Sequence, residues 1–349
     1  MFSTYKPEDV TLLLKDMTGL VTPQPASVRE RLIQSGTHYC EMLPLEYKPS
    51  PAYLAAYEDA LRRYAAMTAR AAAAVAEQIR AEKGPGAVLV SLARAGTPIG
   101  ILIKRWFRLR YGAEVPHYSI SIIKGRGIDR NAMDWILRRH APETIQFVDG
   151  WTGKGAIQRQ LTEAVRDFPG VDGGLAVLSD PAGLARLRGT ADDFLIPSAC
   201  LNATVSGLLS RTFLRPDIIG PEDFHGAAFY RELAAEDVTE AFLSAVCAAF
   251  PQSAPAEIPQ SAPGDALAEA EEIRRTFGIR DLGLVKPGIG EATRVLLRRL
   301  PWKVLVHSME DPEHLGHIYQ LAAEKGAEIA VYPLKHYRAC GLIRDMAET

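Results

Sequence analysis

The chain is 349 residues long, which is long for one compact domain and comfortable for two. Apolar residues make up 47% of it and charged residues 23%, the balance of a globular protein that can bury a full core. The formal net charge of -2 excludes a general attraction to nucleic acid or to an anionic membrane, although a local basic patch is compatible with it.

Cysteine usage and the N-terminus indicate the compartment. The four cysteines lie far apart and form no C-x-x-C pair, so neither a zinc site nor a disulfide framework is indicated. They are Cys40, Cys200, Cys247 and Cys340. Residues 1–10 are polar and carry both signs of charge, unlike a signal peptide, and no stretch approaches the ~20 apolar residues of a membrane span. We therefore expect a soluble, cytoplasmic protein.

Helical and extended patterns alternate through the larger, N-terminal part of the chain. The helical patterns cover residues 51–83, 97–110, 129–139 and 156–167. The apolar strand patterns cover residues 87–92, 117–123, 144–148 and 174–178. Strands that alternate with helices at this spacing predict an α/β fold, with a mostly parallel sheet flanked by helices.

A stretch rich in Pro, Ala and Ser divides the chain. Residues 248–266 repeat the unit P-Q-S-A-P and lack an apolar period, which predicts a semi-extended linker between residues 1–247 and 267–349. The smaller part shows the same alternation of helices and strands. Its helical patterns cover 266–277, 291–300 and 312–325, and its strand patterns cover 282–285, 303–307 and 328–332, the last being the expected final strand. We expect a small α/β/α domain there.

The segment 144–158 carries the clearest chemical signal. An apolar strand ends at the acid Asp149, and the sequence T-G-K-G then leads into a helix. Glycine N–H groups, a threonine hydroxyl and a helix N-terminus together make an anion site, and a lysine adds positive charge. The expected phosphate ligands are Thr152, Gly153, Lys154 and Gly155. A tight turn that merely requires glycine is the plainer alternative.

A second strand-to-helix loop strengthens the prediction of phosphate binding. It follows the strand at 87–92 and contains Arg94, Ala95, Gly96 and Thr97. In open α/β sheets, ligands bind where strand ends lead into helices. Two phosphate-capable loops on successive strands suggest a ligand with phosphates at two ends, while Arg94 as an ordinary surface residue is the alternative.

These two loops resemble those of the type I phosphoribosyltransferases. The segment FVDGWTGKGA resembles the loop that cradles the 5-phosphate of phosphoribosyl pyrophosphate (PRPP), with Asp149 at the second acidic position and Val148 replacing the first acid. The segment SLARAGTP resembles the family's pyrophosphate loop. Residues 117–130 stand where the family carries a flexible catalytic loop, so the resemblance implies Lys124 and Arg126 as closing charges, with a solvated basic loop as the alternative.

The resemblance also implies substrates and a cofactor. These are PRPP, Mg²⁺ and a small base-like acceptor, with diphosphate as the leaving group. Asp149 would bind the ribose, and it is the one side chain implied near the metal. The acceptor would lie under a hood built from about 30–57 and 200–230, where the polar candidates are His38, Tyr39, Glu41, Arg211 and His225. A lone histidine in such a segment is more often structural.

A closer resemblance covers nearly the whole chain apart from the linker. It is to a bacterial group found with tellurite-resistance and stress genes, in which a phosphoribosyltransferase-like domain precedes a small domain similar to Pelota and L7Ae RNA-binding proteins. The matching segments are SGTHYCEMLPLEY, SLARAGTPIG, FVDGWTGKG and residues 200–230. The second domain implies RNA contacts through Lys286, Gly288, Gly290 and Arg294, while docking or dimerisation is an equal alternative because that part has no obvious excess of basic residues.

Two further functions stay open. Loss of the first acid at Val148 suits a non-catalytic sensor that binds PRPP or a nucleotide and carries an RNA-binding tail. Members of the tellurite-associated group have also been named cysteine proteases, which requires a thiolate paired with a histidine. The sequence offers His38 with Cys40, or Cys200 with His225, but spacing does not establish geometry and a buried inert thiol is the commoner state.

Overall fold

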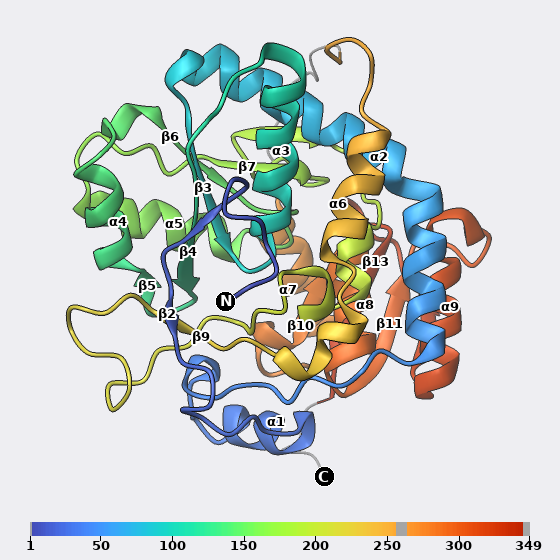
Figure 1. Cartoon of the computed structure of the whole chain (residues 1–349). Helices are drawn as coiled ribbons and strands as arrows, with labels where there is room; N and C mark the ends of the chain where they lie inside the picture. The colour runs from blue at the N-terminus through green and yellow to red at the C-terminus, as the bar shows by residue number, and fades with distance from the viewer. Residues whose placement is uncertain (1, 256–263, 345–349) are drawn as a thin grey trace.

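A computed structural model describes residues 2–255 and 264–344 of the chain (Figure 1). The N-terminal part builds a seven-stranded sheet and a separate two-stranded one, β2 with β9. Its helices are α1 (Ala26–Gln34), α2 (Pro51–Lys83), α3 (Gly96–Tyr111), α4 (Arg130–Leu137), α5 (Ala156–Ala164) and α6 (Thr239–Ala248). Its strands are β1 (Thr11–Leu12), β2 (Lys15–Asp16), β3 (Val88–Ala93), β4 (His117–Ile123), β5 (Gly127–Ile128), β6 (Ile145–Val148), β7 (Leu175–Ser179), β8 (Leu187–Thr190) and β9 (Gly226–Ala227).

The large sheet runs in the order β1-β4-β3-β6-β7-β8, and all of these neighbours are parallel. Only β5, which pairs with β4, is antiparallel. The predicted α/β fold with a mostly parallel sheet flanked by helices is confirmed. Among the five longer strands the chain order reverses between β3 and β6. Open α/β sheets bind ligands at such a switch point, outside the carboxyl ends of the strands.

Helix α2 has the predicted bounds, and local sequence explains where it begins and ends. The Ser50 hydroxyl accepts a hydrogen bond from the N–H of Tyr53, and Pro51 at the first helical position has no N–H to satisfy. Alanines then line its buried face. Gly84, with φ of 68°, ends the helix in a conformation that residues with a Cβ rarely adopt.

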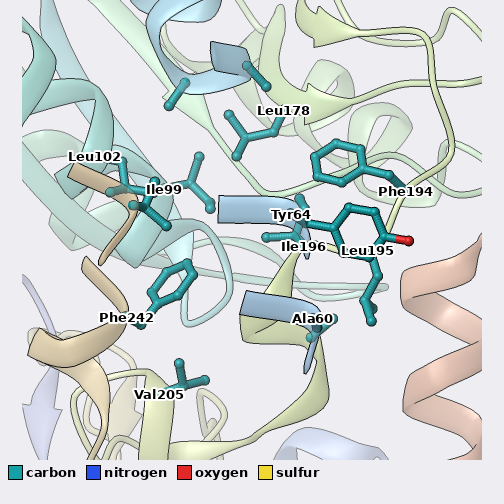
Figure 2. Packing of buried hydrophobic residues seen from close by; sticks show 14 of the residues in the cluster. Ala60, Tyr64, Ile99, Leu102, Leu178, Phe194, Leu195, Ile196, Val205 and Phe242 are labelled. Carbon is teal, nitrogen blue, oxygen red and sulfur yellow. The ribbon is translucent and has the colours of Figure 1, made fainter. Parts of the chain in front are cut away.

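The sheet is buried on both faces. Leu89 of β3 belongs to the core under α2, α3 and α6, while its neighbours Val88 and Val90 pack on the opposite face with α4 and α5. Figure 2 shows the first core, where Tyr64 of α2 lies close to Phe194, their ring centroids 6.0 Å apart. Apolar runs without alternation are expected for such strands, because both faces are covered.

The C-terminal part forms its own four-stranded mixed sheet in the order β10-β13-β11-β12. The helices are α7 (Ala266–Thr276), α8 (Ile289–Arg298) and α9 (Pro312–Lys325), and the strands are β10 (Val285–Pro287), β11 (Pro301–Val306), β12 (Glu328–Val331) and β13 (Ala339–Ile343). The expectation that 328–332 is the final strand was wrong. Strand β13 follows it and lies in the middle of the sheet, antiparallel to β10 and β11.

The two parts share one apolar core. Ile289 and Leu296 of α8 belong to the same buried cluster as α2 and α3 of the N-terminal part. The Tyr64 hydroxyl donates to the carbonyl oxygen of Glu313 at 2.7 Å, which ties α2 to α9, and the two helices lie side by side in Figure 1. The C-terminal part is therefore packed onto the N-terminal part along α8 and α9.

The predicted linker differs at its start. Helix α6 runs to Ala248, and the Phe250 ring packs edge-on against Trp106 at 5.3 Å, so 248–250 belong to the folded N-terminal part. Residues 256–263 of the linker lie outside the described residues. Among the described helices, none combines the length and the apolar character that crossing a membrane requires.

Candidate functional site

The loops after β3 and β6 meet at the switch point. A Cβ built on Gly96 would lie 2.5 Å from the carbonyl oxygen of Val148 and 3.1 Å from the Cα of Asp149. Only glycine permits this approach of the two backbones. Helices α3 and α5 begin directly after these loops, so both helix N-termini lie at this edge of the sheet.

The glycine loop after β6 presents backbone donors. Gly155 has φ of 75° and precedes α5 without a side-chain cap, and the N–H groups of Gly153, Lys154 and Gly155 have no acceptor among the described residues. Thr152 differs from the expectation. Its buried hydroxyl donates to the carboxylate of Asp180, so that proton is not available to a phosphate.

Lys154 also differs from the expectation of a free phosphate-binding charge. Its ammonium donates to the carbonyl oxygens of Leu282 and Val285, the latter at 2.7 Å, just before and within β10. Burial, with Lys286 and Lys124 nearby, lowers its pKa to about 7. The lysine therefore holds the loop against the C-terminal part.

Asp149 lies beneath the loop with one hydrogen bond. Its carboxylate accepts from the N–H of Gly150 at 2.8 Å. Burial raises its pKa to about 6, against the lowering effects of that hydrogen bond and of Arg294. Such a carboxyl changes charge near neutral pH, which suits a group that binds hydroxyls or a cation.

The loop after β3 uses its side chains for packing. The Arg94 guanidinium donates to Leu209 O at 2.5 Å, and it pairs with the Glu46 carboxylate at 3.1 Å. The Thr97 hydroxyl is buried against the Ser119 hydroxyl at 2.7 Å. Gly96 is buried as well, and Ala95 is half-buried. The expected diphosphate contacts of Arg94 and Thr97 are thus not available in this structure.

Residues 117–130 form a hairpin with a short turn, not a long flexible loop. The His38 ring lies 3.0 Å from the carbonyl oxygen of Lys124, and the Tyr39 hydroxyl accepts from the Lys124 N–H at 2.9 Å. Arg126 pairs with Glu41 at 2.9 Å. Three hood candidates therefore clamp the turn. Lys124 lines the cavity beside the loop, whereas Arg126 does not and is held by its carboxylate partner.

The remaining hood candidates separate. Arg211 lines the cavity with its guanidinium 5.2 Å from the centre of the Tyr39 ring, and burial beside Arg29 and Arg94 lowers its pKa. His225 does not line it. Its ring lies 2.8 Å from the Ser121 hydroxyl, on the far side of the hairpin, which indicates a structural role.

The cavity itself has a volume of about 970 Å³ and lies between the glycine loop, α1 and the C-terminal part. A neighbouring cavity of about 760 Å³ shares several of its walls and extends beneath the hood. Both are lined by basic residues that no motif in the sequence marked as binding residues. Among them are Arg29, Arg298 and Arg299, which line both cavities, and Arg31 and Arg280, which line the first.

Comparison with known proteins agrees with one of the resemblances. Residues 3–247 match the family model described as "Tellurite-like stress resistance cysteine protease StiP", and residues 265–345 match the PELOTA RNA binding domain. The "Cysteine protease StiP" of Acinetobacter baylyi is 34% identical over 366 residues, covering 99% of this chain and 94% of that protein. The chain belongs to the StiP family.

Among solved structures, this StiP-family chain is similar to a hypoxanthine-guanine phosphoribosyltransferase from Bacillus anthracis. The identity is 15% and the TM-score 0.27, over 37% of this chain and 79% of that one. The predicted membership of the tellurite-associated group, with a Pelota domain after it, is confirmed by the two family matches.

The StiP description directs attention to the cysteines. Cys40 Sγ lies 2.9 Å from His38 Nδ1, so the structure does bring this pair together. However, Cys40 is fully buried, and burial raises the pKa of its thiol, with Arg126 opposing that rise. Cys200 is also buried, with its pKa raised to about 12 by burial, and its sulfur contacts the carbonyl oxygen of Ala56 at 4.0 Å, whereas the ring of the expected partner His225 contacts Ser121. Neither thiol is both paired with a histidine and accessible to solvent.

The Pelota residues differ from the expected RNA-facing surface. The N–H of Ile289 at the start of α8 donates to both carboxylate oxygens of Asp193, at 3.0 and 3.2 Å, so this helix N-terminus already holds an anion. Gly288 and Gly290 are buried, and a Cβ on Gly290 would lie 2.9 Å from the Trp151 ring. Lys286 and Arg294 line the cavity over the glycine loop.

Proposed function

We propose that this chain is a phosphoribosyltransferase that uses PRPP and a base-like acceptor and releases diphosphate. The observation that carries the proposal is the pairing, at the switch point, of the Gly153–Gly155 backbone donors with the half-buried Asp149 carboxyl beside a basic cavity. A cavity of about 970 Å³ is at the upper end for small-molecule sites. A phosphate at the N-terminus of α5 would place a ribose over Asp149.

The chemistry requires positioning and charge stabilisation, not a covalent residue. The bond between ribose C1 and a diphosphate oxygen breaks, and the acceptor nitrogen forms a bond to C1 and releases its proton to solvent. Backbone N–H groups at the loop hold the 5-phosphate, and Asp149 orients the ribose hydroxyls, which fixes C1 for attack. Cationic side chains above the loop favour the charge that develops on the departing diphosphate.

Magnesium fits this site in part. Its preferred ligands are oxygens, usually one or two carboxylates together with phosphates of the substrate. Asp149 is a half-buried carboxylate that lines the cavity and has one described hydrogen bond, so it would supply the protein ligand. When bound, Mg²⁺ would supply neutralising charge to the diphosphate.

Calorimetric titration with PRPP and Mg²⁺ tests the proposal. We expect the wild type to bind, and Asp149→Asn to bind about ten-fold or more weakly because hydrogen bonds to a charged group are lost. Asp134→Asn, on the exposed face of α4, is the matched control and should bind normally. No binding at millimolar PRPP would overturn the proposal. Binding without diphosphate release in the presence of a panel of bases would favour the non-catalytic sensor.

Cysteine proteolysis is the second candidate, and the short Cys40–His38 contact favours it. The His38 ring is oriented on its other side by the carbonyl of Lys124, so a thiol, a base and an orienting group stand in sequence. Activity would require the hood to open, because Cys40 is 0% exposed. RNA binding by the C-terminal part is supported by its match to the PELOTA domain, at a surface other than the inward face of α8.

A further inference from the structure

Four arginines from three separate segments converge on the space above the glycine loop. They are Arg29 of α1, Arg211 of the hood, and Arg294 and Arg298 of α8, and we call them the arginine cluster. Arg294 and Arg298 are one helical turn apart and so lie on the same face of α8. All four line both cavities, which places the cluster where the two join.

The cluster lacks enough partners of opposite charge. Ten basic and four acidic side chains line the larger cavity, although the whole chain carries a net charge of -2. Of the four acids, Glu30 is taken by Arg299 at 2.7 Å. Glu291 is 3.5 Å from Arg294, and Asp149 lies beneath the loop. The fourth acid, Asp281, accepts from the N–H of Gly283 at 2.6 Å.

Several donors of the cluster also lack hydrogen bonds. Arg29 Nε, Arg211 Nη1, Arg294 Nε and Arg298 Nε are buried without a partner among the described residues. Burial and the neighbouring arginines lower the pKa of Arg211 and Arg298. Buried unpaired charge costs several kcal/mol, so such a group of arginines is expected where an anion compensates it.

We propose that the arginine cluster binds a polyphosphate group, so that α8 of the Pelota part forms one wall of a composite small-molecule site. The Arg294 guanidinium lies 4.2 Å from the centre of the Trp151 ring, next to the glycine loop, and Arg298 reaches the hood at the carbonyl of Leu201, 2.7 Å away. A ligand therefore spans from the loop through Arg294 to Arg298. Planar guanidinium groups suit phosphate oxygens, which accept paired hydrogen bonds.

This proposal rests on the proposed function, which places the 5-phosphate of PRPP at the glycine loop. It adds that the arginine cluster holds a second phosphate group of a ligand. That group is either the diphosphate of the donor or a polyphosphate carried by the acceptor. The cavity favours a small molecule, because residues of both parts of the chain wall it.

Titration calorimetry with three probes tests the proposal: ribose 5-phosphate, PRPP and inorganic tripolyphosphate. The double variant Arg294→Gln/Arg298→Gln removes the α8 side of the cluster, and Arg211→Gln removes the hood side without breaking a described hydrogen bond. The control Arg275→Gln removes an exposed charge from α7 of the same part. We expect both cluster variants to bind tripolyphosphate about ten-fold or more weakly, and ribose 5-phosphate less than about three-fold more weakly.

The probes separate the outcomes. If the cluster variants also bind PRPP more weakly, the cluster holds the diphosphate of the donor. If they bind PRPP normally, the cluster holds a polyphosphate of the acceptor. Either result supports the proposal. Equal losses for ribose 5-phosphate and tripolyphosphate, or no loss for either, overturn it. Tripolyphosphate binding that depends on the cluster, with no binding of ribose 5-phosphate or PRPP, refutes the proposed function and leaves this proposal standing. Binding of an RNA oligonucleotide that depends on the cluster, without binding of any of the three probes, overturns it in favour of RNA.

Discussion

The contact between α8 and the glycine loop can be tested by a single methyl group. Gly290 lies in the first turn of α8, and a Cβ added there would stand 2.9 Å from Cε2 and 3.1 Å from Cζ2 of Trp151. Gly316 in α9 is a matched control, because a Cβ there would meet nothing within 4 Å. Both glycines are helical residues of the C-terminal part.

The two substitutions should change stability in opposite directions. Replacing a helical glycine by alanine stabilises a protein by roughly 0.5–1 kcal/mol, and Gly316→Ala should show most of this gain. At Gly290 the gain is smaller, because the residue is in the first turn, and overpacking against the indole costs about 1–3 kcal/mol. Gly290→Ala should therefore lower the free energy of unfolding by about 1–2 kcal/mol.

Urea denaturation followed by circular dichroism measures both variants. We expect the midpoint of Gly290→Ala below that of the wild type and the midpoint of Gly316→Ala above it. If Gly290→Ala raised the midpoint as much as Gly316→Ala, α8 would not be docked on Trp151. The composite cavity would then lose one of its walls.

Three further predictions concern buried polar groups. Arg105→Met should destabilise the chain by about 3–5 kcal/mol, because Asp9, which pairs with Arg105 at 2.5 Å, would stay buried without a partner. Burial lowers the pKa of His117 to about 4, so this residue's contribution to stability is present above pH ~6.5 and is lost as pH falls toward 4, by about 3 kcal/mol. His117→Asn should flatten that part of the stability–pH curve, measured by urea midpoints. Under native conditions iodoacetamide should label Cys247 first and Cys40 much more slowly than in the unfolded chain, as peptide mass spectrometry would show, because Cys40 is fully buried.

Each of these has an outcome that contradicts it. A loss of less than about 1 kcal/mol in Arg105→Met would mean that Asp9 finds water or another donor. An unchanged pH slope in the His117 variant would show that this ring titrates normally in the folded chain. Rapid labelling of Cys40, with loss of peptidase activity, would favour the protease function over the phosphoribosyltransferase.

Local patterns predicted most of the framework. Helix α2 at 51–83, strand β4 at 117–123 and helix α9 at 312–325 have their predicted bounds. Their caps and periodicity are local in the sequence. The two-residue strands β1 and β2 have too few residues for any period. Strand β13 was missed because its pairing with β10 and β11 is decided by partners distant in the chain.

The site was predicted less completely than the fold. The Thr152 hydroxyl and the Arg94 guanidinium were predicted to bind the ligand. Instead, Thr152 donates to Asp180 and Arg94 donates to Glu46, and both acceptors are distant in the chain. Lys154 is likewise held by carbonyl oxygens more than a hundred positions away. A motif indicates which side chains a loop offers, and the surroundings decide which of them stay free.

The sequence by itself determined the alternation of strands and helices, the glycine loop after Asp149 and the family, because each depends on residues close together in the chain. Only the tertiary structure decided that the Pelota part covers that loop and that arginines of α1, the hood and α8 meet above it. Charge interactions depend on distance in space, so basic residues spread along a nearly neutral sequence can build a strongly cationic cavity once the chain is folded.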